Sequence, residues 1–178
     1  MPLNRTVYLA DEVIALCEYL PAEDDWNDYQ CWQDEDTRRG YNFIRRESFE
    51  EYANGPVRSR FLAAIVRLAD QVPVGSIFLS PEGSPPDLAI MLYRPYRGLG
   101  YGTRAFALGA RYCFETLRLD SITAGCYPTN PASMAMLKKC GFQRHPEGDQ
   151  PETSKFTGEP IIQLDFIKYP NNSPHMEG

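Results

Sequence analysis

The stretch RPYRGLGYGTRAF, residues 94–106, limits the fold of this chain more than any other. It follows the apolar run LAIMLY at 88–93, which is typical of a buried strand, and it leads into an amphipathic helical pattern over roughly 102–118. Glycine has no Cβ and permits positive φ, so alternating glycines leave the first N–H groups of that helix uncovered. These glycines are Gly98, Gly100 and Gly102.

An uncovered helix N-terminus attracts anions, because its free N–H groups and the helix dipole both favour negative charge. The junction therefore predicts a phosphate cradle at the end of the strand, to which Arg97 and Arg104 add positive charge. A merely flexible turn is the alternative. The spacing fits neither the G-x-G-x-x-G dinucleotide fingerprint nor a P-loop, which ends in G-K-[ST].

Hydrophobic patterns outside the junction predict a mixed α/β domain. Strands are expected at 7–10, 60–69, 72–80, 88–93, 121–127 and 161–169. Helices are expected at 11–20, within 22–54, at about 102–118 and at 131–140. The second and third strands should form a hairpin, a right-handed crossover should join 88–93 to 121–127, and helices should cover both faces of the sheet. We expect one domain over 1–170 and a flexible tail over 171–178.

The composition is that of an acidic globular protein, with a net charge of −6 over 178 residues. This negative charge argues against nucleic acid as a partner. No apolar run is long enough for a membrane span, and the N-terminus has acids where a signal peptide needs apolar residues, so we expect a cytoplasmic protein. The five cysteines form no C-x-x-C pair and only two histidines are present, so buried thiols are expected and a metal site is not.

Two segments resemble the GNAT superfamily of N-acetyltransferases. RGLGYG at 97–102 is similar to its acetyl-CoA signature, [QR]-x-x-G-x-[GA], and NPASMAMLKKCGF at 130–142 is similar to the N-x-x-S/A…K-x-G-F segment after its fifth strand. Together they fall within residues 87–145, and they look most similar to the branch of ribosomal-protein N-terminal acetyltransferases. The resemblance implies a mixed, mainly antiparallel sheet with a parallel central pair of strands and helices on both faces.

The resemblance also implies acetyl-CoA as the acetyl donor. Backbone amides of the loop would bind its pyrophosphate; these belong to Arg97, Gly98, Leu99, Gly100, Tyr101, Gly102 and Thr103. The pantetheine arm would pair like an added strand with Met91, Leu92 and Tyr93, where a bulge would part the central strands and one amide would face the thioester oxygen. Asn130 would contact the same arm, or it is simply the N-cap before Pro131.

The catalytic groups that the resemblance implies are Ser133 and Asp87. Ser133 would protonate the leaving sulfur, or it satisfies backbone groups in the first turn of its helix. Many members carry a tyrosine acid where this chain has Leu137, so Ser133, Tyr127 or water would have to serve, or the protein is a non-catalytic acyl-CoA-binding or sensing module. Asp87 would be the general base, or it caps the turn after two prolines. Other candidates for the base are Glu47, Glu50 and Glu51.

The implied reaction is direct attack of a primary amine on the acetyl thioester, with a small-molecule amine or a protein N-terminus as the acceptor. The segment EDDWNDYQCWQDED at 23–36 combines acids with aromatic residues and suits a cationic amine or a basic peptide. The alternative is an amphipathic helix with its aromatic residues in the core and its acids in water. An exposed edge of the last strand would permit a homodimer. Without the resemblance, a phosphate-binding interaction domain is the remaining hypothesis.

Overall fold

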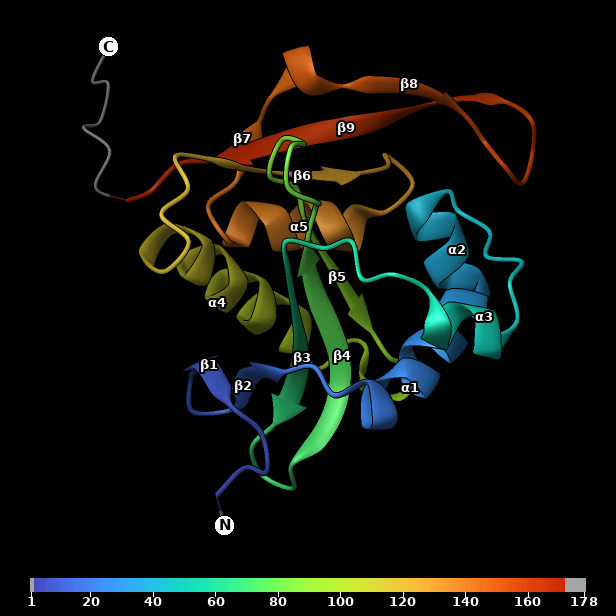
Figure 1. Ribbon diagram of the computed structural model, residues 1–178. Helices are drawn as coiled ribbons and strands as arrows, with labels where there is room; N and C mark the ends of the chain where they lie inside the picture. The colour runs from blue at the N-terminus through green and yellow to red at the C-terminus, as the bar shows by residue number, and fades with distance from the viewer. Residues whose placement is uncertain (1, 172–178) are drawn as a thin grey trace.

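The computed structural model describes residues 2–171, and within them the strands form two sheets (Figure 1). The first sheet is antiparallel, in the order β1-β2-β3-β4-β5. Its strands are β1 Val7–Ala10, β2 Ile14–Glu18, β3 Phe61–Arg67, β4 Val72–Leu79 and β5 Leu88–Leu92. In the second group β9 pairs antiparallel with each of the others. These strands are β6 Ile122–Cys126, β7 Gln143–Arg144, β8 Gln150–Thr153 and β9 Pro160–Lys168. Residues 172–178 of the predicted tail lie outside the described residues.

The two sheets meet at a parallel bridge between Asp87 and Thr123. Thr123 N donates to the carbonyl oxygen of Pro86 at 2.8 Å, and Thr123 Oγ1 donates to Asp87 Oδ2 at 3.0 Å. Beyond this bridge β5 pairs only with β4, and β6 pairs only with β9, in the part of the chain that the structure describes. The predicted parallel direction of this strand pair is therefore confirmed, but the hydrogen bonding between the two strands is limited to the bridge at their start.

The pairing of β4 with β5 keeps one register, so the bulge predicted at residues 91–93 is wrong. The register shifts instead between Ile65 and Val66, where β3 pairs with β4. Each of the parted strands stays in register with its own sheet. The opening between them therefore comes from the divergence of two regular sheets and not from a kink in β5.

Helices cover both faces of the first sheet, as predicted (Figure 1). On one face lie α1 Pro21–Gln33, α2 Glu35–Tyr41 and α3 Phe49–Asn54, and on the other lies α4 Tyr101–Glu115. The last helix, α5 Pro131–Lys139, packs against α4 and β6. Two short 3-10 helices are η1 Arg94–Tyr96 and η2 Pro146–Gly148.

Local capping signals explain where most of these helices begin. Asp34 caps α2 by accepting a backbone N–H bond at 3.2 Å, and Ser48 forms a capping box with Glu51 at the start of α3. Asn130 caps α5, with Pro131 in the first helical position. In contrast, α4 begins without any side-chain cap. The helix after the glycine junction thus has no side chain that covers its first turn; α1 also lacks a side-chain cap, but there the carbonyl of Leu20 accepts from Glu23 N and Asp24 N.

The helix predicted at residues 11–20 is wrong, because β2 occupies the middle half of this range. Residues 14–17 are 0% exposed and pair with β1 on one side and β3 on the other. A strand covered on both faces carries a continuous apolar run, which periodicity does not distinguish from a helix. Asp11 turns the chain into β2, since its carboxylate accepts bonds from Val13 N and Ile14 N at 2.7 and 2.8 Å.

The main core lies between the first sheet and α4 and continues to the second sheet. Phe106 of α4, Leu137 of α5 and Phe166 of β9 are each 1% exposed. The rings of Phe106 and Phe142 contact each other with centroids 5.3 Å apart. The five cysteines are buried and free, as predicted. Among the described residues, no helix has the length and apolar character needed to cross a membrane.

Gly75 in β4 should tolerate no side chain. A Cβ there would lie 2.1 Å from the carbonyl oxygen of Met91, which belongs to the backbone of β5. We expect Gly75→Ala to lower the free energy of unfolding by about 1–3 kcal/mol or more, measured by urea denaturation. Gly40→Ala in α2 is the control, because a Cβ there meets nothing closer than 3.8 Å and alanine favours a helix. Equal stability of Gly75→Ala and the wild type would contradict this packing.

Candidate functional site

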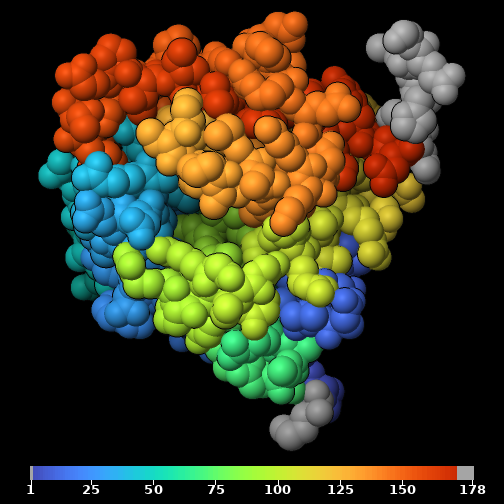
Figure 2. Space-filling view, turned by 180° about the vertical axis from the view of Figure 1, so that it is seen from behind, coloured from blue at the N-terminus to red at the C-terminus, as the bar shows by residue number. Residues whose placement is uncertain are grey.

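A groove of about 560 Å³ lies where β5 and β6 part. Figure 2 shows a hollow between the blue segment that contains α2, the yellow-green loop before α4 and the orange α5. Its walls come from β5, β6, α2, α5 and the start of the loop. The structure thus brings the glycine junction and the 130–142 segment to one cavity.

Most of the predicted site residues border this groove. Those that line it are Asp87, Met91, Leu92, Arg97, Gly98, Asn130 and Ser133. The remaining loop residues, Leu99, Gly100, Tyr101, Gly102 and Thr103, lead into the first turn of α4. Tyr93 is not brought to the groove, because its N–H donates to Val74 O at 2.9 Å and its hydroxyl donates to Asp28 on the other face of the sheet.

The loop before α4 presents a row of open N–H groups. Gly98 and Gly100 have φ of 74° and 87°, a left-handed conformation that side chains rarely adopt. Within residues 2–171, none of the N–H groups from Gly98 to Thr103 has a hydrogen-bond partner, and the first bond of this turn runs from Arg104 N to Gly100 O at 3.4 Å. Successive open amides at a helix N-terminus form a site for an anion.

The outer edge of β5 offers donors to the groove and few acceptors. Bonds from Tyr93 N to Val74 O and from Ser80 N to Asp87 O fix which groups face β4, so the N–H groups of Ile90 and Leu92 point away from it. The carbonyl of Ile90 accepts from the hydroxyl of Tyr41, and that of Leu92 accepts from Arg97 Nε at 2.9 Å. The open edge therefore suits a ligand that brings hydrogen-bond acceptors.

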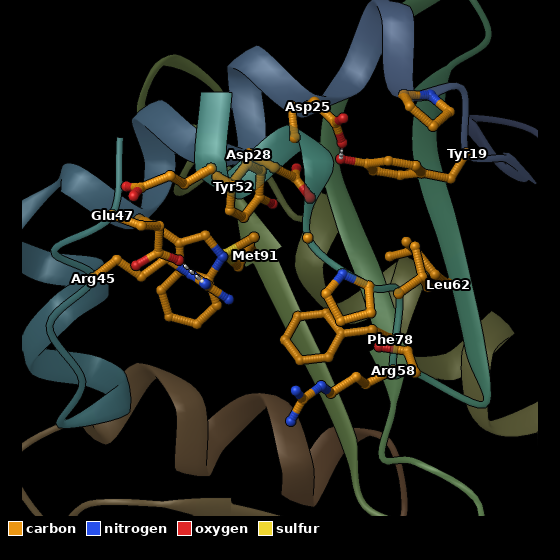
Figure 3. A pocket seen from close by; sticks show the side chains of 18 residues that line it. Tyr19, Asp25, Asp28, Arg45, Glu47, Tyr52, Arg58, Leu62, Phe78 and Met91 are labelled. Carbon is orange, nitrogen blue, oxygen red and sulfur yellow. Dashed lines mark hydrogen bonds and ion pairs between the residues drawn. The ribbon is translucent and has the colours of Figure 1, made fainter. Parts of the chain in front are cut away.

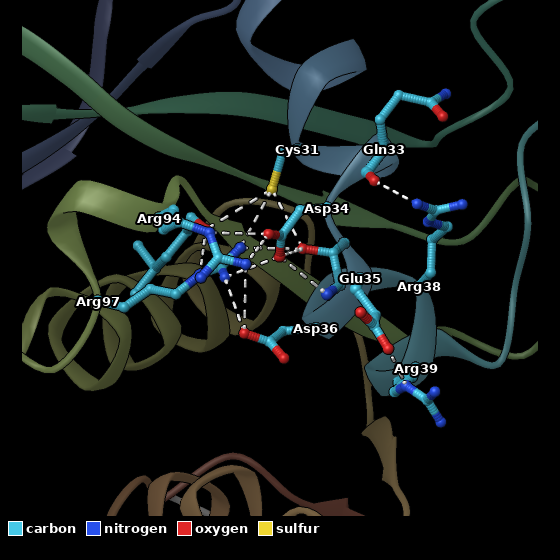
Figure 4. A network of polar contacts seen from close by, with 11 residues as sticks. Cys31, Gln33, Asp34, Glu35, Asp36, Arg38, Arg39, Arg94 and Arg97 are labelled. Atoms are coloured by element: carbon cyan, nitrogen blue, oxygen red, sulfur yellow. Dashed lines mark hydrogen bonds and ion pairs between the residues drawn. The ribbon is translucent and has the colours of Figure 1, made fainter.

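The arginines near the loop are held by acids (Figure 4). Arg97 Nη1 donates to Asp34 Oδ2 at 2.8 Å, Arg97 Nη2 donates to Thr37 Oγ1 at 2.9 Å, and Arg94 Nε donates to Asp34 Oδ1 at 2.9 Å. Arg104 pairs likewise with Asp11 and Glu12. These acids offset the positive charge that Arg97 and Arg104 were predicted to add to the cradle, so that prediction stays open while the loop offers unbonded backbone N–H groups.

Asp34 accepts hydrogen bonds from both Arg94 and Arg97 in this network. Partial burial disfavours its charge, but the bonds from Arg97, Arg94 and Thr37 N outweigh that effect and lower its pKa to about 2. Because Asp34 also caps α2, the same carboxylate links that helix to the loop before α4.

Asp87 lies at the closed end of the groove, beside the bridge between the sheets. Its carboxylate accepts from Thr123 Oγ1 and not from the turn after the prolines, so the turn-capping alternative is wrong. Burial raises the pKa of Asp87 to about 6, against the lowering effect of the Thr123 hydroxyl. A carboxylate of this kind is a competent proton acceptor near neutral pH.

Asn130 and Ser133 are brought together at the start of α5. Ser133 N donates to Asn130 Oδ1 at 3.2 Å, so the predicted N-cap is present, and both residues also line the groove. Leu137 follows one turn later in the same wall and offers no proton. Tyr127 does not reach the groove, since it is 4% exposed and its hydroxyl donates to Glu152. Of the three predicted sources of a proton, Ser133 and water are therefore left.

A second cavity, of about 480 Å³, lies on the α1 side of the first sheet (Figure 3). Phe78 and Met91 line both this cavity and the groove. The two tryptophans of the acidic and aromatic segment 23–36 lie in different surroundings. Trp32 is 8% exposed and lines the cavity, whereas Trp26 is 50% exposed. Of the other acids considered, Glu47 and Glu51 line this cavity and Glu50 does not.

Comparison with known proteins gives one family and several relatives. Residues 12–143 match the family model described as an acetyltransferase (GNAT) domain. Probable N-acetyltransferase YjcK of Bacillus subtilis (strain 168) is 37% identical over 116 residues, which make up 64% of this chain and 59% of that protein. The match thus spans less than two thirds of the length of this curated relative.

Solved structures show the same fold at low identity. An acetyltransferase (GNAT family) from Bacillus anthracis has a TM-score of 0.73 at 16% identity, covering 90% of this chain and 97% of that one. The spermidine N-acetyltransferase from Vibrio cholerae, solved in complex with CoA and spermine, has a TM-score of 0.75 at 17% identity, covering 89% of this chain and 96% of that one.

The Asp34 network predicts a pH dependence of stability. A carboxyl group whose pKa is lower in the folded state than in the unfolded state stabilises the fold. This stabilisation is complete at pH values above the unfolded-state pKa, and it is lost as the pH falls toward the folded-state pKa. Asp34→Asn keeps a residue that can cap α2 but removes the charge, so it should cost about 1–2 kcal/mol at pH 7. In urea denaturation, this difference from the wild type should stay constant above about pH 5 and shrink toward pH 2.

Glu35→Gln is the matched control for this measurement, because Glu35 is adjacent but pairs only at the surface with Arg39. It should change the free energy of unfolding by less than about 0.5 kcal/mol. A difference between Asp34→Asn and the wild type that persists unchanged at pH 2 would contradict the assigned pKa.

Proposed function

Because this chain belongs to the GNAT acetyltransferase family, we propose that it transfers the acetyl group of acetyl-CoA to a primary amine by direct attack. One observation carries the proposal: the open amides of the Gly98–Thr103 loop lead into a groove between two parted strands. An anion cradle joined to a slot with free strand donors fits a diphosphate followed by an amide-containing arm. The similar fold of a spermidine N-acetyltransferase solved with CoA supports this choice of donor.

The backbone carries most of the proposed contacts with acetyl-CoA. The loop amides from Gly98 to Thr103 bind the pyrophosphate, whereas the N–H of Arg97 already donates to Arg94 O at 3.4 Å. The groove edge pairs with the pantetheine arm through Leu92, the side chain of Met91 lines the groove, and Asn130 also contacts the arm. The N–H of Leu92 is the proposed donor to the thioester oxygen, where negative charge develops during attack. We leave Tyr93 out of these contacts, because its N–H and its hydroxyl already have partners.

Two side chains are proposed to move protons. Asp87 accepts a proton from the attacking amine through water, because its raised pKa suits a base near neutral pH. Ser133 lines the groove and is the proposed donor to the leaving sulfur. The amine nitrogen bonds to the carbonyl carbon, the carbon–sulfur bond breaks, and the sulfur leaves as the free thiol of CoA.

The finer assignment concerns the branch and the acceptor. We propose the branch of ribosomal-protein N-terminal acetyltransferases on the similarity of RGLGYG and NPASMAMLKKCGF to its motifs. The acceptor enters from the cavity beside α1, since this cavity shares two wall residues with the groove.

A second candidate function is an acyl-CoA-binding module that does not turn over. It is favoured by Leu137 at the usual tyrosine position and by the engagement of Tyr127 with Glu152. A screen of amines and peptide N-termini with acetyl-CoA, followed by the release of free thiol, decides between the two. Acceptor-dependent release supports the enzyme, and tight binding of acetyl-CoA with no release under any acceptor supports the module.

Gly100→Val should weaken the binding of acetyl-CoA by about 100-fold, because the side chain strains the loop and covers amides that bind a charged group. Isothermal titration calorimetry measures this, with wild-type affinity expected at tens of micromolar or tighter. Gly83→Val is the matched control: Gly83 has φ of 85° against 87° for Gly100, both have open space around them, and Gly83 lies in a distant turn. Equal affinity of the Gly100 variant and the wild type would refute the cradle.

Asp87→Asn should lower kcat by about 10² to 10⁴-fold and flatten its pH profile. In the wild type, kcat at saturating acceptor should rise as the pH increases through about 6, because the carboxylate accepts a proton only when ionised. Asp120→Asn, an exposed position just before β6, is the control and should behave as the wild type. A variant at Asp87 that keeps the wild-type profile would exclude this residue as the base.

A further inference from the structure

Asp28 of α1 is a buried carboxylate without a cationic partner. It is 3% exposed, and it forms no ion pair within the part of the chain that the structure describes. Its oxygens accept from Ser76 Oγ at 2.9 Å and from the hydroxyl of Tyr93 at 2.6 Å. Nearby Asp24, also buried, is paired with Arg5 at 2.5 Å. Buried carboxylates are normally paired with a cation, so Asp28 departs from the usual pattern.

Asp28 also lines the second cavity (Figure 3). The cavity has aromatic walls, and acids outnumber bases among its lining residues, which include Asp25, Asp28, Glu47, Glu51, Arg45 and Arg58. Arg45 is already bonded to Glu47, and Asp25 accepts from Tyr19 at 2.8 Å. Arg45 also lies over the rings of Trp32 and Tyr52, 4.9 and 5.0 Å from their centroids, so the remaining negative charge of the cavity is what favours a cation as the occupant.

The cavity also adjoins the place where acetyl transfer is proposed. Ser76, which donates to Asp28, is paired in register with Met91, and Met91 lines both cavity and groove. The cavity and the groove are therefore adjacent, and the residue that separates them, Met91, lies opposite the residue that donates to Asp28.

The chemistry of the reaction limits which group Asp28 can hold. An amine attacks a thioester only in its neutral form, so the attacking nitrogen cannot remain an ammonium ion paired with a carboxylate. A charge that stays at Asp28 during the reaction must belong to another group of the acceptor. Burial raises the pKa of Asp28 to about 6, against the lowering effect of Tyr93 and Ser76, and the carboxylate is still ionised above neutral pH.

We propose that Asp28 binds a second cationic group of the acceptor, so that an acceptor with two cationic groups is preferred over a monoamine. This rests on the proposed acetyl transfer and names the class of acceptor. Asp28 is a specificity-determining residue in this proposal, while Asp87 and Ser133 remain the groups that move protons.

The test compares 1,4-diaminobutane with n-butylamine, which share a chain length and differ in the second charge. Binding without acetyl-CoA is followed by tryptophan fluorescence, since Trp32, one of the two tryptophans, lines the same cavity, and kcat/KM is followed by thiol release. The wild type should prefer the diamine by about 30-fold or more in both measurements. Asp28→Asn should bring this ratio close to one, mainly through KM, while its affinity for acetyl-CoA stays as in the wild type.

Two matched variants separate charge recognition from structure. Glu23→Gln removes a carboxylate from the exposed start of α1 and should keep the wild-type ratio. Ser76→Ala removes a hydrogen bond to Asp28 but leaves its carboxylate, and it should keep a preference for the diamine. Loss of the preference in Ser76→Ala as complete as in Asp28→Asn would overturn the proposal, since a merely structural contact predicts that result.

Measurements on the wild type alone also test the proposal, even if Asp28→Asn fails to fold. A wild-type diamine to monoamine ratio near one overturns the proposal. A wild type that releases no thiol with any amine contradicts the proposed function, but a diamine preference in binding that disappears in Asp28→Asn still supports the role of Asp28.

Discussion

The arrangement of this protein depends on the separation of β5 from β6 after a single bridge. Two adjacent strands with open edges would normally pair, because unbonded backbone groups in a protein interior are costly. Here each strand is in register with its own sheet, and the interaction of Asp87 with Thr123 holds the sheets together at one end. Side chains satisfy part of the free edge of β5, since Tyr41 and Arg97 donate hydrogen bonds to two of its carbonyls. What remains open is a set of N–H donors directed into a groove.

The pleat of β5 explains how one strand serves two cavities. Alternate side chains point to opposite faces of a strand, so Leu88 packs in the core with α4 while Met91 lies among the residues of α1. The backbone edge between these faces borders the groove, and Met91 borders the second cavity as well. The proposed donor along the edge and the proposed acceptor on the α1 face would therefore meet at the same few residues.

Local signals in the sequence predicted the parts of the site that depend on neighbouring residues. The glycine loop, the Asn130 cap and the strand at 88–93 are all found, because each follows from backbone chemistry over a few residues. The helix predicted at 11–20 failed because the burial of β2 on both faces is a property of the assembled sheet. Asp28 lies in the acidic and aromatic segment 23–36 that the sequence marked for a cationic acceptor, but the sequence did not single it out among the acids there, because its partner on β4 is distant in the sequence. The bond of Tyr41 to β5 was missed for the same reason.

The pairing of Arg97 with Asp34 shows why the arginines of the junction are misleading when considered alone. Three arginines and three glycines within residues 94–106 suggest binding by charge, yet Arg94 and Arg97 are bonded to an acid on α2. An anion in the loop is therefore met first by oriented backbone N–H groups, which select for the shape and spacing of its oxygens. Arg97 also bonds the carbonyl of Leu92, so one side chain connects the loop, α2 and the strand edge where the thioester is proposed to lie. The guanidinium of Arg97 thereby links the proposed donor site to the start of α2.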